Sequence, residues 1–129
     1  MDYNNTKAPF YSEAERQFAP IQNWTVHGVD TLVLYFQGVV TNAAGPVCVG
    51  VHDSAGQTAR FVHPNPDAVR QVEWQRWDIA LADISKAGVN IKSIKKMFIG
   101  VGDRDKPQPG GAGRVYIDAI RLTIAPKAP

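Results

Sequence analysis

The strongest constraint on this chain is a two-residue alternation of apolar and polar side chains that recurs in short runs. Residues 31–37 carry leucine, leucine and phenylalanine at every second position, and residues 47–52 do the same with three valines. Successive side chains of a β-strand point to opposite faces of the sheet, so each run predicts a strand with one apolar face. The turn-forming residues 53–56, followed by residues 58–63, predict a β-hairpin.

Similar runs occur at three further places: residues 77–81, 97–101 and 114–124. Residues 11–18 fit either a strand or a short helix, and only residues 66–69 and 81–85 suggest single helical turns. Many short strands in one small domain favour two antiparallel sheets packed face to face. We therefore expect an all-β fold, an antiparallel β-sandwich with jelly-roll topology.

Composition bounds the domain count and excludes several function classes. The 129 residues suffice for one domain, and 44% hydrophobic with 20% charged residues is ordinary for a globular protein. The net charge of +2 is too weak for nucleic-acid binding, and no apolar run reaches the ~18 residues of a membrane span. We expect one module at 1–124 and a Pro-rich linker or tail at 125–129, cut from a longer chain.

The sequence carries none of the common catalytic signatures. It has no GxSxG elbow, no HExxH and no phosphate-binding GxxxxGK[ST]. His27, His52 and His63 lack metal-ligand spacing, and the single cysteine, Cys48, lies in an apolar run typical of an inert strand thiol. We expect a protein that is not an enzyme.

A set of polar and aromatic side chains falls on the strand faces opposite the predicted core. Its members are Tyr35, Gln37, His52, Arg60, Arg76 and Asp78. Aromatic rings stack on the apolar faces of sugars, and forked polar side chains hydrogen-bond sugar hydroxyls. The sequence therefore predicts a concave sugar-binding surface, with ordinary solvated strand residues as the alternative.

The three tryptophans receive different predictions. Trp77 alternates with apolar neighbours and is expected in the core, and Trp24 is expected to plug one end of the fold. Trp74 faces away from Trp77, or lies in the preceding loop, and is the best tryptophan candidate for stacking on a sugar.

One carboxylate in the last strand needs a partner. This carboxylate is Asp118, which by simple alternation shares its face with Tyr116, Ile120 and Leu122. A buried carboxylate is costly unless it meets a cation, so Asp118 predicts either a salt bridge to Arg16 or a bound Ca²⁺. Further calcium ligands could come from Asp2, Glu13 or Glu15.

A long turn-rich loop spans residues 102–113, between two predicted strands. Loops of this length often carry function, and Asp103 and Asp105 could bind a second cation or sugar hydroxyls. The alternative is a rigid surface loop in which these two aspartates pair locally with Arg104.

Several short segments, in this order, carry a resemblance to a known family. They are residues 11–18 (YSEAERQF), 23–25 (NWT), 32–38 (LVLYFQG), 73–79 (EWQRWDI), 97–103 (MFIGVGD) and 115–122 (VYIDAIRL). Together they cover nearly the whole chain. The sequence resembles the non-catalytic carbohydrate-binding modules of the galactose-binding-domain-like superfold, which are appended to secreted bacterial multidomain proteins.

The resemblance implies a jelly-roll fold, binding of a polysaccharide or glycan, and a structural Ca²⁺ between the first and last strands. The ion site would fall on Asp118 with Asp2 or Glu13, although Ala119 stands where similar modules often have a second aspartate. We expect a secreted or extracellular monomer that contacts other domains of its parent protein. The alternative is a structural or adhesion module that contacts another protein domain and binds no sugar.

Overall fold

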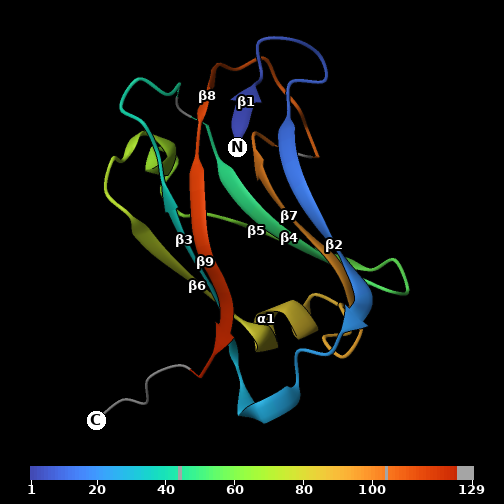
Figure 1. The fold of residues 1–129 in the computed structure, drawn as a ribbon. Coiled ribbons are helices and arrows are strands. Elements are labelled where there is room, and N and C mark those ends of the chain that lie inside the picture. The colour runs from blue at the N-terminus through green and yellow to red at the C-terminus, as the bar shows by residue number, and fades with distance from the viewer. Residues whose placement is uncertain (44, 104, 125–129) are drawn as a thin grey trace.

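The computed structural model describes residues 1–43, 45–103 and 105–124 (Figure 1), so the predicted linker at 125–129 lies outside the described residues. The elements are β1 (Asp2–Asn4), β2 (Ser12–Gln22), η1 (Val26–Gly28), β3 (Thr31–Gln37), β4 (Val47–Asp53), β5 (Thr58–Val62), η2 (Ala68–Arg70), β6 (Gln75–Ala80), α1 (Leu81–Lys86), β7 (Ile94–Val101), β8 (Ala112–Arg114) and β9 (Tyr116–Thr123).

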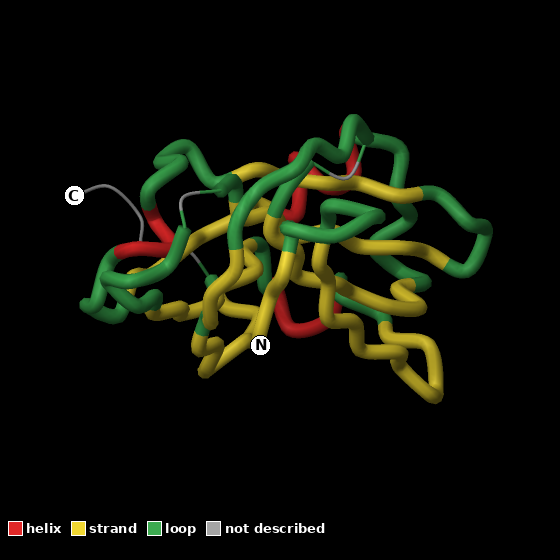
Figure 2. Tube along the Cα trace, turned by 90° about the horizontal axis from the view of Figure 1, so that it is seen from above, coloured by secondary structure: helices red, strands yellow, loops and turns green. Residues whose placement is uncertain are grey.

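The strands of the described residues form three antiparallel sheets. The largest has the order β2-β7-β4-β5, a second has the order β6-β3-β9, and the short strands β1 and β8 pair with each other. Strands dominate the described chain, and its helical segments are short (Figure 2). The prediction of a mostly β, antiparallel fold is confirmed. Within the described residues, no helix is long and apolar enough to cross a membrane.

The hydrophobic core takes its side chains from the alternating strands of both larger sheets. Leu32, Leu34 and Phe36 of β3 belong to the same buried cluster as the three alternate valines of β4. Their side chains alternate inward as the two-residue period predicts, because the apolar face of each strand is buried against the other sheet. The core prediction for Trp77 is confirmed, since its side chain is buried in this cluster; Trp24, which was predicted to plug one end of the fold, is buried in the same cluster.

The predicted hairpin at 47–63 is confirmed, and a buried carboxylate holds its turn. β4 and β5 pair from Cys48 opposite Val62 to His52 opposite Thr58. The Asp53 carboxylate accepts backbone N–H groups from within the turn and from Asn90, at 2.8–2.9 Å. These hydrogen bonds, that from Asn90 foremost, lower the pKa of Asp53, so the buried group stays ionised.

Residues 11–18, whose pattern fits either a strand or a short helix, belong mostly to β2. That strand pairs along the edge of β7, from Ser12 opposite Val101 to Gln17 opposite Lys96. β2 has no described partner on its other side, which makes it an edge strand of the four-stranded sheet.

The last strand departs from simple alternation. Along β3, Val33 and Tyr35 are two residues apart, but their partners on β9, Arg121 and Asp118, are three apart. The extra residue makes a β-bulge, and Ala119 takes a left-handed conformation there, with φ of 51°. The expectation that Asp118 shares a face with Leu122 is therefore wrong. Leu122 lies opposite core-facing Leu32, whereas Asp118 lies opposite Tyr35 on the outer face.

Candidate binding face

The residues predicted to form one sugar-binding surface are divided between two sheets. Tyr35 and Gln37 lie on β3, and Arg76 and Asp78 on β6, all in the three-stranded sheet. His52 and Arg60 lie on β4 and β5, in the four-stranded sheet. The expectation of a single surface is wrong, because alternation assigns a residue to a face but not a strand to a sheet.

The outer face of the three-stranded sheet presents a regular grid of side chains. Tyr35 lies between Arg76 on β6 and Asp118 on β9, each directly opposite it in register. One row along, Val33 lies between Asp78 and Arg121. Directly opposed residues on one face of a sheet stand about 5 Å apart, so the other side chains of these two rows are close neighbours, although Val33 itself has no exposed surface.

Two charged groups of this grid are paired with each other. Arg76 Nε donates to Asp78 Oδ1 at 2.7 Å, and both side chains remain about two-fifths exposed. The hydrogen bond to Asp78 raises the pKa of Arg76, and Tyr35 acts in the same direction. The pair leaves donor and acceptor atoms of both groups facing solvent.

Further exposed rings border the grid. Tyr116 lies opposite Gln37 and is 45% exposed. Trp74 lies in the loop before β6, as one of the two sequence predictions had it, and is 50% exposed. Gln37 Nε2 donates to the carbonyl oxygen of Val72 in that loop, which ties the loop to the sheet. We call the surface formed by Tyr35, Trp74, Arg76, Asp78, Tyr116 and Asp118 the open face.

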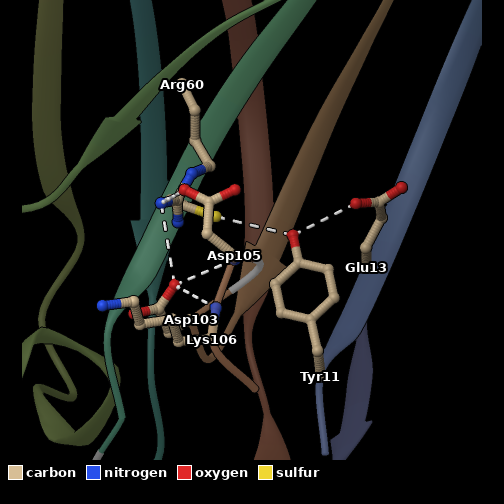
Figure 3. A network of polar contacts seen from close by, with 7 residues as sticks. Tyr11, Glu13, Arg60, Asp103, Asp105 and Lys106 are labelled. Atoms are coloured by element: carbon tan, nitrogen blue, oxygen red, sulfur yellow. Dashed lines mark hydrogen bonds and ion pairs between the residues drawn. The ribbon is translucent and has the colours of Figure 1, made fainter. Parts of the chain in front are cut away.

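The outer face of the four-stranded sheet is built differently, around Arg60 (Figure 3). One guanidinium nitrogen lies 2.8 Å from Asp105 Oδ2 and 3.7 Å from Asp103 Oδ1. Asp103 also accepts the backbone N–H groups of Asp105 and Lys106 at 2.9 and 3.1 Å, and these bonds lower its pKa. The loop aspartates thus pair with a strand residue far away in sequence; Arg104 lies outside the described residues.

Beside Arg60, the hydroxyl of a tyrosine contacts the thiol of the free cysteine. The Tyr11 hydroxyl lies 3.1 Å from Glu13 Oε1 and 3.6 Å from Cys48 Sγ (Figure 3). Burial is the main cause that raises the pKa of Tyr11 well above its usual value, and contact with Cys48 adds to it. Cys48 itself is fully buried, which agrees with an inert strand thiol.

Aromatic rings on this side rest directly on glycines. A Cβ placed on Gly50 would lie 1.9 Å from the Phe98 ring, and one on Gly100 would lie 2.0 Å from the Tyr11 hydroxyl. The His52 ring packs against Phe98 with ring centroids 5.6 Å apart. Phe98 is 1% exposed although it lies outside the main core. We call the surface formed by Tyr11, Glu13, Cys48, His52, Arg60 and Phe98 the covered face.

The three carboxylates predicted to bind Ca²⁺ are not brought together. Asp2 pairs with Arg114 on the small sheet, and the hydrogen bond to Arg114 lowers the pKa of Asp2. Glu13 belongs to the covered face, and the Asp118 carboxylate accepts the N–H of Ala119 on the open face. Among the described residues no group of three or more His, Cys, Asp or Glu side chains could hold a metal ion. This ligand set does not fit one calcium ion, which needs several oxygens around a common centre.

The alternative partner of Asp118 is also placed elsewhere. The Arg16 guanidinium lies 5.9 Å from the centroid of the Phe18 ring, on β2. Within the described part of the chain, no ion pair joins Arg16 to Asp118. Asp118 is exposed because it lies opposite Tyr35 on the outer face, so it needs no buried cation.

The sequence assigned no binding role to Tyr116 or Tyr11, and predicted for Asp118 either a calcium ion or a salt bridge to Arg16. The two-residue period did place Tyr116 and Asp118 on one face of the last strand. The sequence did not predict that β9 pairs with β3, and this pairing places both side chains beside Tyr35 and Gln37.

Comparisons with protein-family models, with curated proteins and with solved structures found no match to this chain.

Proposed function

We propose that this protein is a non-catalytic module that binds a polysaccharide or glycan on its open face. The observation that supports this most strongly is the row Arg76–Tyr35–Asp118, with the exposed rings of Tyr116 and Trp74 at its border. The rings can stack on the C–H faces of pyranose units, while the guanidinium, carboxylates and amide hydrogen-bond the hydroxyls. The proposal is recognition without catalysis because the sequence carries no GxSxG, HExxH or GxxxxGK[ST] signature.

The charges of the open face, taken together with Arg121 beside it, favour a neutral glycan. Arg76 and Arg121 are balanced by Asp78 and Asp118 in adjacent rows of the grid. An anionic glycan would gain from the arginines and lose by a similar amount to the aspartates. A neutral chain lying along the strands uses both kinds of group as hydrogen-bond partners.

The finer features implied by the family resemblance belong to this proposal. They are a jelly-roll connection of the strands, a place in a secreted or extracellular multidomain protein, contacts with the other domains of that protein, and a monomeric state. The predicted calcium ligands are separated, so no part of the proposed recognition depends on an ion.

The test is affinity electrophoresis and pull-down of the whole chain with neutral and uronic-acid polysaccharides. We expect binding to neutral polysaccharides, and a loss of about tenfold or more for Tyr116→Ala or Arg76→Gln. Arg60→Gln on the covered face is the matched control and should retain binding. Each variant is checked for an unchanged fold by its thermal melting curve.

Two results would overturn the proposal. One is the absence of binding across the panel by a correctly folded chain, which favours the structural or adhesion alternative. The other is a loss of binding in Arg60→Gln that equals the loss in Arg76→Gln, which would move the site to the covered face.

A further inference from the structure

An apolar cleft opens along one seam of the molecule, between the two outer faces, and its lining includes Phe98 of the covered face and Arg121 beside the open face. Its volume is about 410 Å³, and it lies between β2 and β7 on one side and β9 on the other. Most of the residues that line it are apolar: Ala14, Phe18, Trp24, Leu32, Met97, Phe98, Ile99, Ile117, Ile120 and Leu122. The others are polar or charged: Glu15, Arg16, Gln22 and Arg121. Clefts of this size and character are typical of binding sites.

The strands beside the cleft are both edges of their sheets. The described strands give β2 a partner only in β7, and β9 a partner only in β3. Both edges lie at the front of the molecule in Figure 1, β9 in red-orange and β2 in blue. Such edges carry rows of backbone N–H and C=O groups that another strand can pair with.

The two larger sheets differ by one strand, and the cleft coincides with that difference. Four strands of one sheet face three of the other. The inner positions of β2 are consequently left open: Ala14 lies opposite core-facing Ile99, yet is exposed. A fourth strand beside β9 would stand about 4.8 Å from it, and would cover these positions.

A positively charged side chain at the cleft indicates one property of a ligand that would fill it. Arg16 lies opposite core-facing Met97, so it projects from the inner side of β2 at the cleft. Its guanidinium lies over the Phe18 ring, and among the described residues no carboxylate lies within salt-bridge distance. An acidic group on the occupant would complement this guanidinium.

Two other occupants fit less well. Residues 125–129, Ala-Pro-Lys-Ala-Pro, contain two prolines without backbone N–H groups and no large apolar side chain. They are therefore unsuited to form a fourth strand beside β9. A second copy would pair through a strand that carries its own facing sheet, and that sheet would compete for the space of β2. A single strand without a sheet of its own meets neither difficulty.

We propose that this seam binds an extended polypeptide segment of a partner protein, which adds a fourth strand beside β9. Alternate apolar side chains of the segment fill the cleft, and an acidic side chain pairs with Arg16. Main-chain hydrogen bonds supply affinity in this mode, and the pockets for alternate side chains supply specificity. The cleft shares Arg121 with the border of the open face, so the experiment below measures glycan binding separately from peptide binding.

The test selects a phage-displayed library of random short peptides on the whole chain, after subtraction on the Ile120→Lys variant. We expect enriched sequences with apolar residues at alternate positions and an acidic residue among them. The best peptide, made synthetically, should lose about tenfold or more in affinity to Ile120→Lys or Arg16→Glu, measured by calorimetry. Its N-methylated form, which cannot donate along the edge, should not bind.

Val62→Lys is the matched control. Val62 is 49% exposed on the edge strand β5, at the opposite seam, and Ile120 is 45% exposed. The proposal is overturned if no peptide is enriched, if the enriched peptides lack alternation, if the N-methylated peptide binds equally well, or if Val62→Lys weakens binding as much as Ile120→Lys. Polysaccharide binding should be unchanged in Ile120→Lys, which separates failure here from failure of the proposed function.

Discussion

The two outer faces of this protein carry similar residue types but use them in opposite ways. On the covered face, Arg60 is held by two aspartates, and Phe98 is almost wholly buried. On the open face, Tyr116 and Trp74 are about half exposed, and Arg76 keeps much of its surface in solvent. Polar groups already satisfied by one another gain little from a ligand, whereas exposed rings and solvated forked groups can exchange water for sugar. Composition of a face is therefore a weaker guide to binding than the partners its side chains already have.

The largest expected effect tests whether the covered face is packed like a core. Gly50→Ala places a Cβ 1.9 Å from the Phe98 ring, so the ring must move and the packing beneath Arg60 is disturbed. We expect a loss of about 2 kcal/mol in the free energy of unfolding, measured by urea denaturation. Gly110→Ala is the control, since its Cβ would make an ordinary 3.4 Å contact with Asn5. Equal stability of the two variants would show that the face is loosely packed.

A second prediction compares the loss of one arginine from each face, Arg60 and Arg76. Arg60→Ala removes the ion-pair partner of Asp103 and Asp105 and the contacts of the arginine side chain with the covered face. The free energy of unfolding should therefore fall by about 1 kcal/mol, and glycan binding should be retained. Arg76→Ala should do the reverse, with little change in stability because its ion pair is largely solvated. Thermal melting and affinity electrophoresis on both variants give the four values needed. The same pattern in both variants would contradict the distinction between the faces.

The third prediction concerns alkaline pH. Burial raises the pKa of Tyr11 above its usual value near 10, so the folded state holds this proton more tightly than the unfolded state. The resulting stabilisation is fully present below about pH 10 and is lost as the pH rises further. Tyr11→Phe has no such proton, so it should lose less stability between about pH 8 and pH 10.5, measured by urea denaturation. Identical losses in both proteins would show that the hydroxyl is not buried in solution.

The smallest expected effect lies in the bulge that shapes the open face. Ala119 has φ of 51°, where a Cβ is unfavourable, so Ala119→Gly should raise stability by about 0.5 kcal/mol. Ala80→Gly, at φ of −66°, is the control and should lower stability by a similar amount. Chemical denaturation resolves the difference in sign. Destabilisation by both substitutions would mean that the bulge is not left-handed in solution.

Local pattern was sufficient for most of the strands and for the core. The alternation at 31–37 corresponds to β3 with the same ends, and that at 47–52 corresponds to β4, which also includes Asp53. Leu32, Leu34 and Phe36 point inward as predicted, because the two-residue period and the burial of apolar surface are both properties of the strand itself.

The candidate site was only partly predictable. Five of the proposed ligand residues, Tyr35, Gln37, Trp74, Arg76 and Asp78, fall on or beside one sheet, and two, His52 and Arg60, fall on the other. The sequence placed each of them outside the core but had no means of ordering the strands, since pairing joins residues far apart along the chain. Leu122 illustrates a second limit, because the extra residue in β9 between Asp118 and Arg121 changes which face every later side chain takes.

The sequence by itself determined that this protein is built of short antiparallel strands and which side chains of most strands are buried. Only the tertiary structure decided that β9 lies beside β3, that Arg60 meets Asp103 and Asp105, and that the two larger sheets differ by one strand. The physical reason is that alternation is imposed by the local geometry of each strand. Sheet order, in contrast, is set by the whole chain, which must satisfy its backbone hydrogen bonds and bury its apolar faces at the same time.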